Sequence, residues 1–299
     1  MFGEAVAKAL QYTRPMVISA CTESGECSST IGTYVVLNNE GWILTAGHLM
    51  EIIRQQHQAV QLHAGYRDNV IQFERDVTAD KRYRKKGVRT FQKPSASNLR
   101  HHSVWWGEDG LRLVEARILL PADLAIGRLE PISPDTFTHY PMLKNPDNHY
   151  LPGTMLCKLG FPLHAITPEF DPTDNTFTLP AGSVPLPAFP LEGIFTRVIQ
   201  SSLPSGNNEK SGTFIETSTP SLIGMMGGPV FDTNAAIWGI QSHTMHHGLD
   251  FQTVVRSRSS KIHTQQFLNT GLAVHATAIR DFLNAHSINY QTETSQDSI

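Results

Sequence analysis

Cysteine is scarce in this sequence, which constrains both its compartment and its covalent chemistry. Only Cys21, Cys27 and Cys157 occur among 299 residues. Small secreted domains are held together by several disulfides, and an odd, low count is a poor basis for such a framework. We therefore expect reduced thiols, with Cys157 as a small core residue in an apolar segment. A bridge between Cys21 and Cys27 is the alternative, and it would close only a short loop.

Long apolar runs are absent as well. No segment approaches the roughly 18 consecutive apolar residues of a membrane-spanning helix, so we expect no membrane partner. The first residues lack a charged segment followed by an apolar one, which argues against a signal peptide. Their apolar residues have helical spacing instead, and they predict a short amphipathic helix over residues 1–15. A bacterial, cytoplasmic protein is the setting that these features favour.

The chain also has little charge of either sign. Charged residues make up 17% and the formal net charge is -3, so the whole chain does not indicate a nucleic-acid or anionic membrane partner. The segment Lys81–Arg100 is an exception, because it holds eight lysines or arginines and no acidic residue. Such a run can bind an anionic partner through phosphates or carboxylates. The alternative is a solvated insertion loop.

Short strands separated by turn residues predominate after Pro15, which is typical of an all-β sandwich or barrel. Leu49–Gln56 predicts one or two helical turns, and Ala276–Ala285 has the apolar spacing of a helix. Clear strands are expected at Met16–Ala20, Gly32–Leu37, Trp42–Thr45, Val114–Leu120, Leu124–Leu129, Met155–Leu159, Gly193–Gln200, Thr213–Glu216, Val230–Asp232 and Ile237–Gln241.

Three segments carry residues with catalytic potential. His48 directly follows an apolar strand, Asp123 begins another, and the glycine-rich turn Gly224–Pro229 lies far downstream. In acyl transfer an imidazole takes a proton from a nucleophile, and a buried carboxylate orients that imidazole. Backbone N–H groups then hold the developing oxyanion. The order histidine, aspartate, glycine-rich turn is that of chymotrypsin-type catalytic triads.

These segments resemble the trypsin-like, chymotrypsin-fold serine peptidases, and most of all their bacterial stress-protease branch. The resemblance extends over roughly residues 16 to 285, and its blocks occur in the family's order. The matching blocks are Thr-Ala-x-His at Thr45–His48, Asp-Leu-Ala at Asp123–Ala125, Gly-Phe-Pro at Gly160–Pro162, Gly-x-Ser-Gly-Gly-Pro at Gly224–Pro229, and Gly-Leu-Ala-Val at Gly271–Val274.

The resemblance implies an all-β fold of two antiparallel β-barrels with a peptide-binding cleft between them. The expected division is a first barrel over residues 16–130 with the basic insertion 81–100, a second barrel over 152–270, a C-terminal helix over 271–286 and a disordered tail over 287–299. It also implies an oxyanion hole formed by Gly224 and Met226. Peptide contacts would come from the strand residues Gln241, Ser242 and His243.

Met226 occupies the position where the family has its nucleophilic serine. A thioether has no proton for His48 to remove, and it cannot form an acyl ester. The sequence therefore predicts a serine endopeptidase-family protein that is catalytically inactive but retains its cleft. One alternative is an active endopeptidase whose serine has been replaced by mutation. A second is an interaction module built on the basic segment.

Histidines near the end of the second half suggest a metal site only weakly. His243, His246 and His247 lie within five residues, yet no cysteine or carboxylate accompanies them at the spacing of zinc ligands. We expect neither a metal nor another cofactor. No acidic residue lies in the segment Pro220–Gly224 either, so a preference for cleavage after arginine or lysine has no support. The expected partner is a peptide or protein of unspecified sequence.

Overall fold

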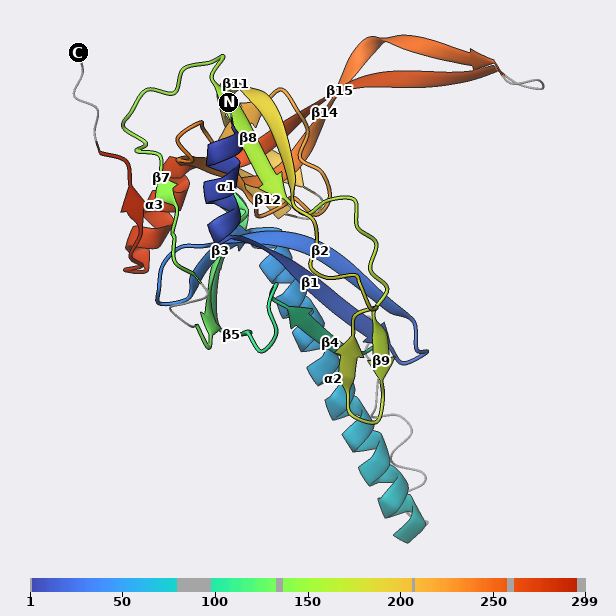
Figure 1. Cartoon of the computed structure of the whole chain (residues 1–299). Helices are drawn as coiled ribbons and strands as arrows, with labels where there is room; N and C mark the ends of the chain where they lie inside the picture. Colours follow the sequence, from blue (N-terminus) through green and yellow to red (C-terminus); the bar gives the residue numbers. More distant parts are fainter. Residues whose placement is uncertain (1, 80–97, 133–136, 206–207, 257–260, 295–299) are drawn as a thin grey trace.

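The computed structural model describes residues 2–79, 98–132, 137–205, 208–256 and 261–294 (Figure 1). The elements, in chain order, are α1 (Gly3–Tyr12), β1 (Thr13–Thr22), β2 (Cys27–Val36), β3 (Trp42–Ala46), α2 (Gly47–Ala79), β4 (Leu99–Trp105), β5 (Arg112–Leu119), the 3-10 turn η2 (Leu120–Ala122), β6 (Leu124–Glu130), β7 (Met142–Leu143), β8 (Met155–Gly160), β9 (Glu169–Asp171), β10 (Thr176–Thr178), β11 (Phe189–Ser205), β12 (Asn208–Thr217), β13 (Pro229–Phe231), β14 (Ile237–Arg256), β15 (Lys261–His275), α3 (Ala276–Ala285) and β16 (Gln291–Thr292).

Two curled sheets form the body of the molecule. The first has the strand order β4-β1-β2-β3-β6-β5, and all its pairs are antiparallel. In the second, β13 pairs with both β8 and β14, which closes β13, β8, β11, β12, β15 and β14 into a ring. The short strands β7 and β16 extend this sheet with parallel pairing. With short helices at its two ends, this is the predicted two-barrel, chymotrypsin-like arrangement.

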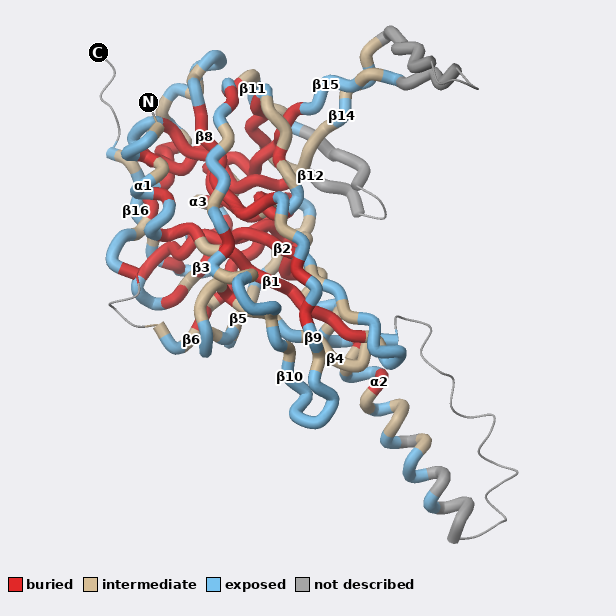
Figure 2. The backbone as a smooth tube through the Cα atoms, turned by 45° about the vertical axis from the view of Figure 1, so that its right-hand side comes forward, coloured by how far each residue is buried: buried red, intermediate tan, exposed pale blue. Residues whose placement is uncertain are grey.

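Apolar side chains from both sheets meet in one core, which appears as the buried centre in Figure 2. Val35 and Leu124 come from the first sheet, and Leu159 and Phe214 from the second; none of the four is solvent-exposed. Successive strand residues point to opposite faces, so each sheet turns one apolar face toward the other. Of the residues singled out in the sequence, His48 lies in the first turn of α2 directly after β3, Asp123 lies between η2 and β6, and Gly224 lies in the turn before β13.

Helix α2 is much longer than predicted. It runs over 33 residues, whereas the spacing around Leu49–Gln56 predicted one or two turns. From His57 to Ala79 the helix contains three glutamines, three alanines, two arginines and one glutamate, which are all good helix formers. Much of that length faces solvent (Figure 2), so it lacks the apolar stripe on which the prediction relied. Among the described residues, no helix is both long and apolar enough to cross a membrane.

The helical and tail boundaries also differ from expectation. Residues 13–15 already belong to β1, and residues 271–275 end β15 before α3 begins. Part of the predicted disordered tail is ordered, because Ile288 is buried in the core and β16 pairs with β7. Ile288 and the partly buried Tyr290, which packs against the same core, are few apolar residues in a polar stretch, so composition alone indicated disorder. Residues 295–299, and the basic segment up to residue 97, lie outside the described residues.

Candidate active site

His48 and Asp123 are brought together by the pairing of two neighbouring strands. Ala46 of β3 lies opposite Leu124 of β6, so the residues that follow and precede them are adjacent. His48 Nδ1 lies 2.9 Å from Asp123 Oδ1 and 3.1 Å from Oδ2. The backbone N–H of His48 donates to the same Oδ1 at 2.8 Å. With Nδ1 bonded to a carboxylate, the other ring nitrogen, Nε2, is left to accept a proton.

The carboxylate of Asp123 is buried, with 1% of the residue exposed, whereas His48 is partly open to solvent. Asp123 has a φ of +55°, a left-handed conformation that non-glycine residues seldom adopt. Its Oδ2 accepts a hydrogen bond from the hydroxyl of Ser242. Ser242 is also a predicted peptide contact, but its bond to Asp123 has no local signal in the sequence, because 119 residues separate the partners. The three donors hold the carboxylate in one orientation beneath the imidazole.

The glycine-rich turn is pinned by backbone hydrogen bonds on both sides. Thr33 N–H donates to Met226 O at 2.9 Å, and Gly227 N–H donates to Gln241 O at 2.8 Å. Gly227 has a φ of +85°, and an added Cβ would lie 2.1 Å from Thr33 O, so only glycine fits there. Within the described residues, the N–H groups of Gly224 and Met226 donate to no protein acceptor. Two such donors suit a carbonyl oxygen or an oxyanion.

Met226 itself is partly buried and packs against the apolar core of the first barrel, which includes Met16 and Tyr34. The contact agrees with the use of methionine as a gap-filling side chain. Its thioether offers no proton to His48. The structure therefore pairs His48 with a buried carboxylate, and the side chain at position 226 has no hydroxyl or thiol group.

Gln241 and His243 differ in their access to a ligand. Gln241 is fully buried, and its Nε2 donates to Leu159 O at 2.9 Å, so its side chain supports the turn and does not reach the cleft. His243 is partly exposed, with Nδ1 2.9 Å from Ser242 Oγ. A β-bulge between Gln241 and His243 explains the difference, because in a regular strand residues two apart would point to the same face. The backbone of Gln241 is engaged as well, since its N–H donates to Gly228 O at 2.9 Å and its carbonyl accepts from Gly227 N–H at 2.8 Å.

Lys158 is a buried lysine that the sequence analysis did not single out. It lies in the otherwise apolar strand β8 with 1% of its surface exposed. Its Nζ donates to the carbonyl oxygens of Thr219 and, at 3.1 Å, Pro220, just upstream of the glycine-rich turn. No carboxylate among the described residues forms an ion pair with it. Burial lowers the pKa of Lys158 to about 7.

We expect Lys158 to make unfolding pH-dependent. The folded pKa of about 7 lies below the ordinary value of 10.5, so between these values the unfolded chain binds a proton that the folded chain does not. Stability should therefore rise with pH across this window, by up to about 1.4 kcal/mol per pH unit. Lys158→Met should remove the rise in urea titrations from about pH 7 to 10. The exposed Lys8→Met is the control, and an unchanged slope in Lys158→Met would contradict the assignment.

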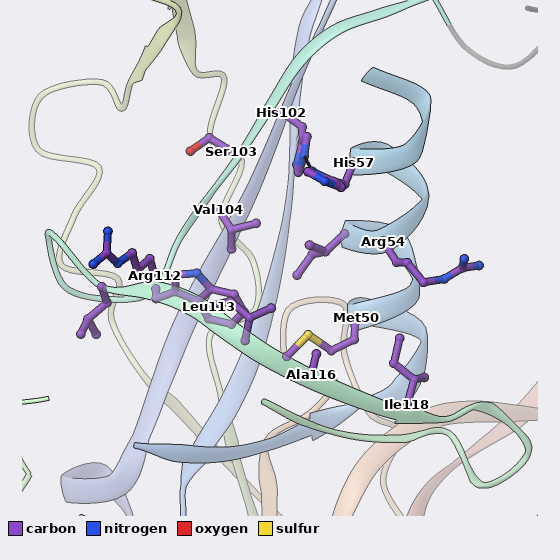
Figure 3. Close-up of a pocket in the computed structure, with 13 residues that line it drawn as sticks. Met50, Arg54, His57, His102, Ser103, Val104, Arg112, Leu113, Ala116 and Ile118 are labelled. Atoms are coloured by element: carbon purple, nitrogen blue, oxygen red, sulfur yellow. Dashed lines mark hydrogen bonds between the residues drawn. The ribbon is translucent and has the colours of Figure 1, made fainter. Parts of the chain in front are cut away.

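Several cavities border the first barrel, and two of them differ in their relation to the site. The larger, about 660 Å³, is formed by α2, β4 and β5 and contains none of the residues discussed above (Figure 3). His57 and His102 face each other in it, with Nδ1 and Nε2 3.2 Å apart. The smaller, about 400 Å³, adjoins the glycine-rich turn and is lined by Gly224, Ile223, the start of β2 and the loop after β8. Only the smaller cavity is therefore placed to extend a site at Gly224.

Metal ligands do not gather elsewhere in the part of the chain that the structure describes. No group of three histidine, cysteine, aspartate or glutamate side chains there could hold an ion. His246 and His247 have different partners, since His246 Nδ1 lies 2.7 Å from Asn269 Oδ1 and His247 Nε2 lies 3.1 Å from Thr270 Oγ1. Neighbouring strand residues diverge in this way because they lie on opposite faces.

Comparison with known proteins gives no family assignment. No protein-family model and no curated protein sequence matches the chain. Among solved structures, the active form of the Rv3671c protease from M. tuberculosis is 13% identical, with a TM-score of 0.49, 97% of this chain covered and 86% of that one. The HtrA-type protease AlgW with a tripeptide is 16% identical, with a TM-score of 0.46, 96% of this chain covered and 65% of that one. At these values neither likeness bears on the chemistry or ligands of this chain.

Proposed function

We propose that the chain is a trypsin-like serine endopeptidase-family protein that binds peptides in its cleft without hydrolysing them. One observation carries the proposal: His48 Nδ1 lies 2.9 Å from the buried Asp123 carboxylate, while a methionine stands at the sequence position of the family's nucleophile. Keeping a base and an oxyanion cradle suits binding of a peptide carbonyl. Losing the hydroxyl removes the covalent step, because no acyl-enzyme ester can form on a thioether.

The magnitude of the expected loss distinguishes binding from slow catalysis. Removing the nucleophile from comparable enzymes lowers kcat by about 10⁶-fold, and binding plus an oxyanion hole leaves about 10³-fold catalysis over water. Hydrolysis at that residual rate would be negligible beside peptide association and release. The proposal therefore predicts that a bound peptide dissociates from the cleft without being cleaved.

An open strand edge supports an extended ligand. β2 pairs with β1 from Cys27 to Val35, whereas it pairs with β3 only at Tyr34–Val36. The first half of β2 thus has one side without a strand partner among the described residues. This edge borders the cavity of about 400 Å³ beside Gly224. An extended peptide can add to such an edge through main-chain hydrogen bonds.

Binding is tested with fluorescent peptides from a digest of an unfolded protein, measured by anisotropy and checked for cleavage by mass spectrometry. Ile223 is 84% exposed and lines the cavity beside Gly224, so Ile223→Glu should weaken binding at least about tenfold. Leu62→Glu on α2, where the leucine is 59% exposed, is the matched control and should bind normally. Equal binding by both variants, or rapid cleavage by the parent, would overturn the proposal.

The alternative is an active serine endopeptidase whose serine has been replaced in this sequence. The native gene separates the two, since a serine codon at position 226 would favour the active enzyme. For the location we keep the bacterial cytoplasm as a proposal, on the basis of three cysteines without a disulfide.

The basic segment Lys81–Arg100 supports a further proposed contact, with an anionic partner, although most of it lies outside the described residues. Reversing the charges of Arg84, Lys85 and Lys86 should abolish salt-sensitive binding to polyanions such as heparin, because ion release drives such association. The melting temperature should stay the same, and peptide binding in the cleft should be unaffected. Unchanged polyanion binding would show that this segment does not bind the anionic partner.

A further inference from the structure

Two of the three cysteines face each other across a hairpin. Cys21 on β1 and Cys27 on β2 are register partners in the antiparallel pair, separated along the chain by the turn that joins the strands. Their Sγ atoms lie 2.9 Å apart. A disulfide bond is about 2.05 Å long, so a movement of about 0.9 Å would bring the sulfur atoms to bonding distance. The register pairing of the two strands keeps the two sulfur atoms close to each other.

The two thiols differ in their access to a reagent. Cys27 is partly exposed and lines the cavity of about 400 Å³ beside Gly224. Cys21 is buried, with 1% exposed, and burial raises the pKa of its thiol to about 11. Cys157 is buried on β8 in the second barrel, where it has no register partner of its own type. A reagent from solution therefore meets Cys27 first, and Cys21 reacts only from within the hairpin.

We propose that Cys21 and Cys27 form a redox modification site that takes a low-molecular-weight disulfide of the glutathione class. The Cys27 thiolate attacks one sulfur of the small disulfide, whose S–S bond breaks and releases one thiol. The resulting mixed disulfide on Cys27 is then attacked by the Cys21 thiolate, which forms the Cys21–Cys27 bond and releases the second thiol. The two cysteine protons end on the two released thiols, so the protein is oxidised and the small disulfide reduced.

The bridge would act on the wall of the small cavity. Cys27 is the first residue of β2 that lines this cavity, and the unpartnered edge of β2 begins there. A covalent link to β1 would fix that end of the wall and remove a thiol from the cavity surface. The site stands independently of peptide binding, because it rests on the hairpin alone.

The test treats the reduced, folded full-length chain with an excess of oxidised glutathione, followed by alkylation in denaturant and peptide mass mapping. Cys21 and Cys27 should become linked, with Cys157 alkylated. Cys21→Ser should stop at a stable glutathione adduct on Cys27. Cys27→Ser should gain adducts at least about tenfold more slowly than the parent, because its remaining thiols are buried. Cys157→Ser should behave as the parent.

Each variant is first checked for an unchanged melting temperature, and Cys21→Ala replaces Cys21→Ser if the hydroxyl unfolds the hairpin. Dithiothreitol should return the linked chain to three free thiols. Equal alkylation of all three cysteines after treatment would overturn the proposal. So would a parent chain that keeps glutathione on Cys27 without forming the bridge, since the geometry then does not support the second step.

Discussion

Replacing Met226 with serine is expected to convert a chain that does not react with fluorophosphonates into one that is labelled at residue 226. The serine hydroxyl would stand beside His48, whose Nδ1 is already 2.9 Å from the Asp123 carboxylate, so the imidazole can remove its proton. The N–H groups of Gly224 and residue 226, which have no protein acceptor among the described residues, are the proposed donors to the oxyanion. Restoring the nucleophile should raise the acylation rate by several orders of magnitude, up to about 10⁶.

Two variants define the baseline for this gain. Met226→Ala shortens the side chain without supplying a hydroxyl, so it should remain unlabelled. His48→Ala combined with Met226→Ser keeps the hydroxyl but lacks the base, and it should label slowly. Labelling of the parent chain would contradict the loss of the nucleophile. If Met226→Ser fails to label, the base or the oxyanion donors no longer function, and the peptidase part of the proposal is wrong.

Asp123→Asn in the Met226→Ser background is expected to lower kcat by about 10⁴-fold. An amide can turn its NH₂ group toward Nδ1 of His48, which then accepts a hydrogen bond and leaves the proton on Nε2. The imidazole is in the wrong tautomer to act as a base. Because Asp123 is buried and also accepts from Ser242, the amide cannot escape this environment by turning to solvent.

A second buried aspartate separates this effect from a loss of stability. Asp232 accepts a hydrogen bond from Trp238 Nε1 at 3.0 Å and two from backbone N–H groups, in the second barrel. Asp232→Asn should therefore lower the melting temperature and leave kcat nearly unchanged. A pH–rate profile gives the specific readout, since only Asp123→Asn should change the limb that reports on His48. Equal rates in the two aspartate variants would contradict the role of Asp123.

Some of this site was predictable because its parts lie next to strand ends. His48 follows β3 and Asp123 precedes β6, and the two strands pair directly, so short motifs sufficed to place them together. Ser242 and Lys158 were not predictable in their roles. Their partners, Asp123 and the Thr219–Pro220 carbonyls, are 119 and about 61 residues away, and no local pattern encodes such contacts.

The fold was likewise predictable in some parts and not in others. Short apolar runs separated by turn residues predicted the main strands of both sheets, and several of these strands are buried along most of their length. The full length of α2 was not predicted, because a largely solvent-exposed helix depends on residue propensity and has little apolar periodicity. The order in residues 287–294 depends on Ile288, whose burial is decided by tertiary packing and has no local signal.

A crystal structure of the unmodified chain with a bound peptide tests the central claim most directly. The peptide should lie intact and extended along the open edge of β2, with one carbonyl oxygen accepting hydrogen bonds from the N–H groups of Gly224 and Met226. That result would show peptide binding at the proposed N–H donors, without cleavage, in one structure. A cleaved peptide, or one bound away from these N–H groups, would contradict the account.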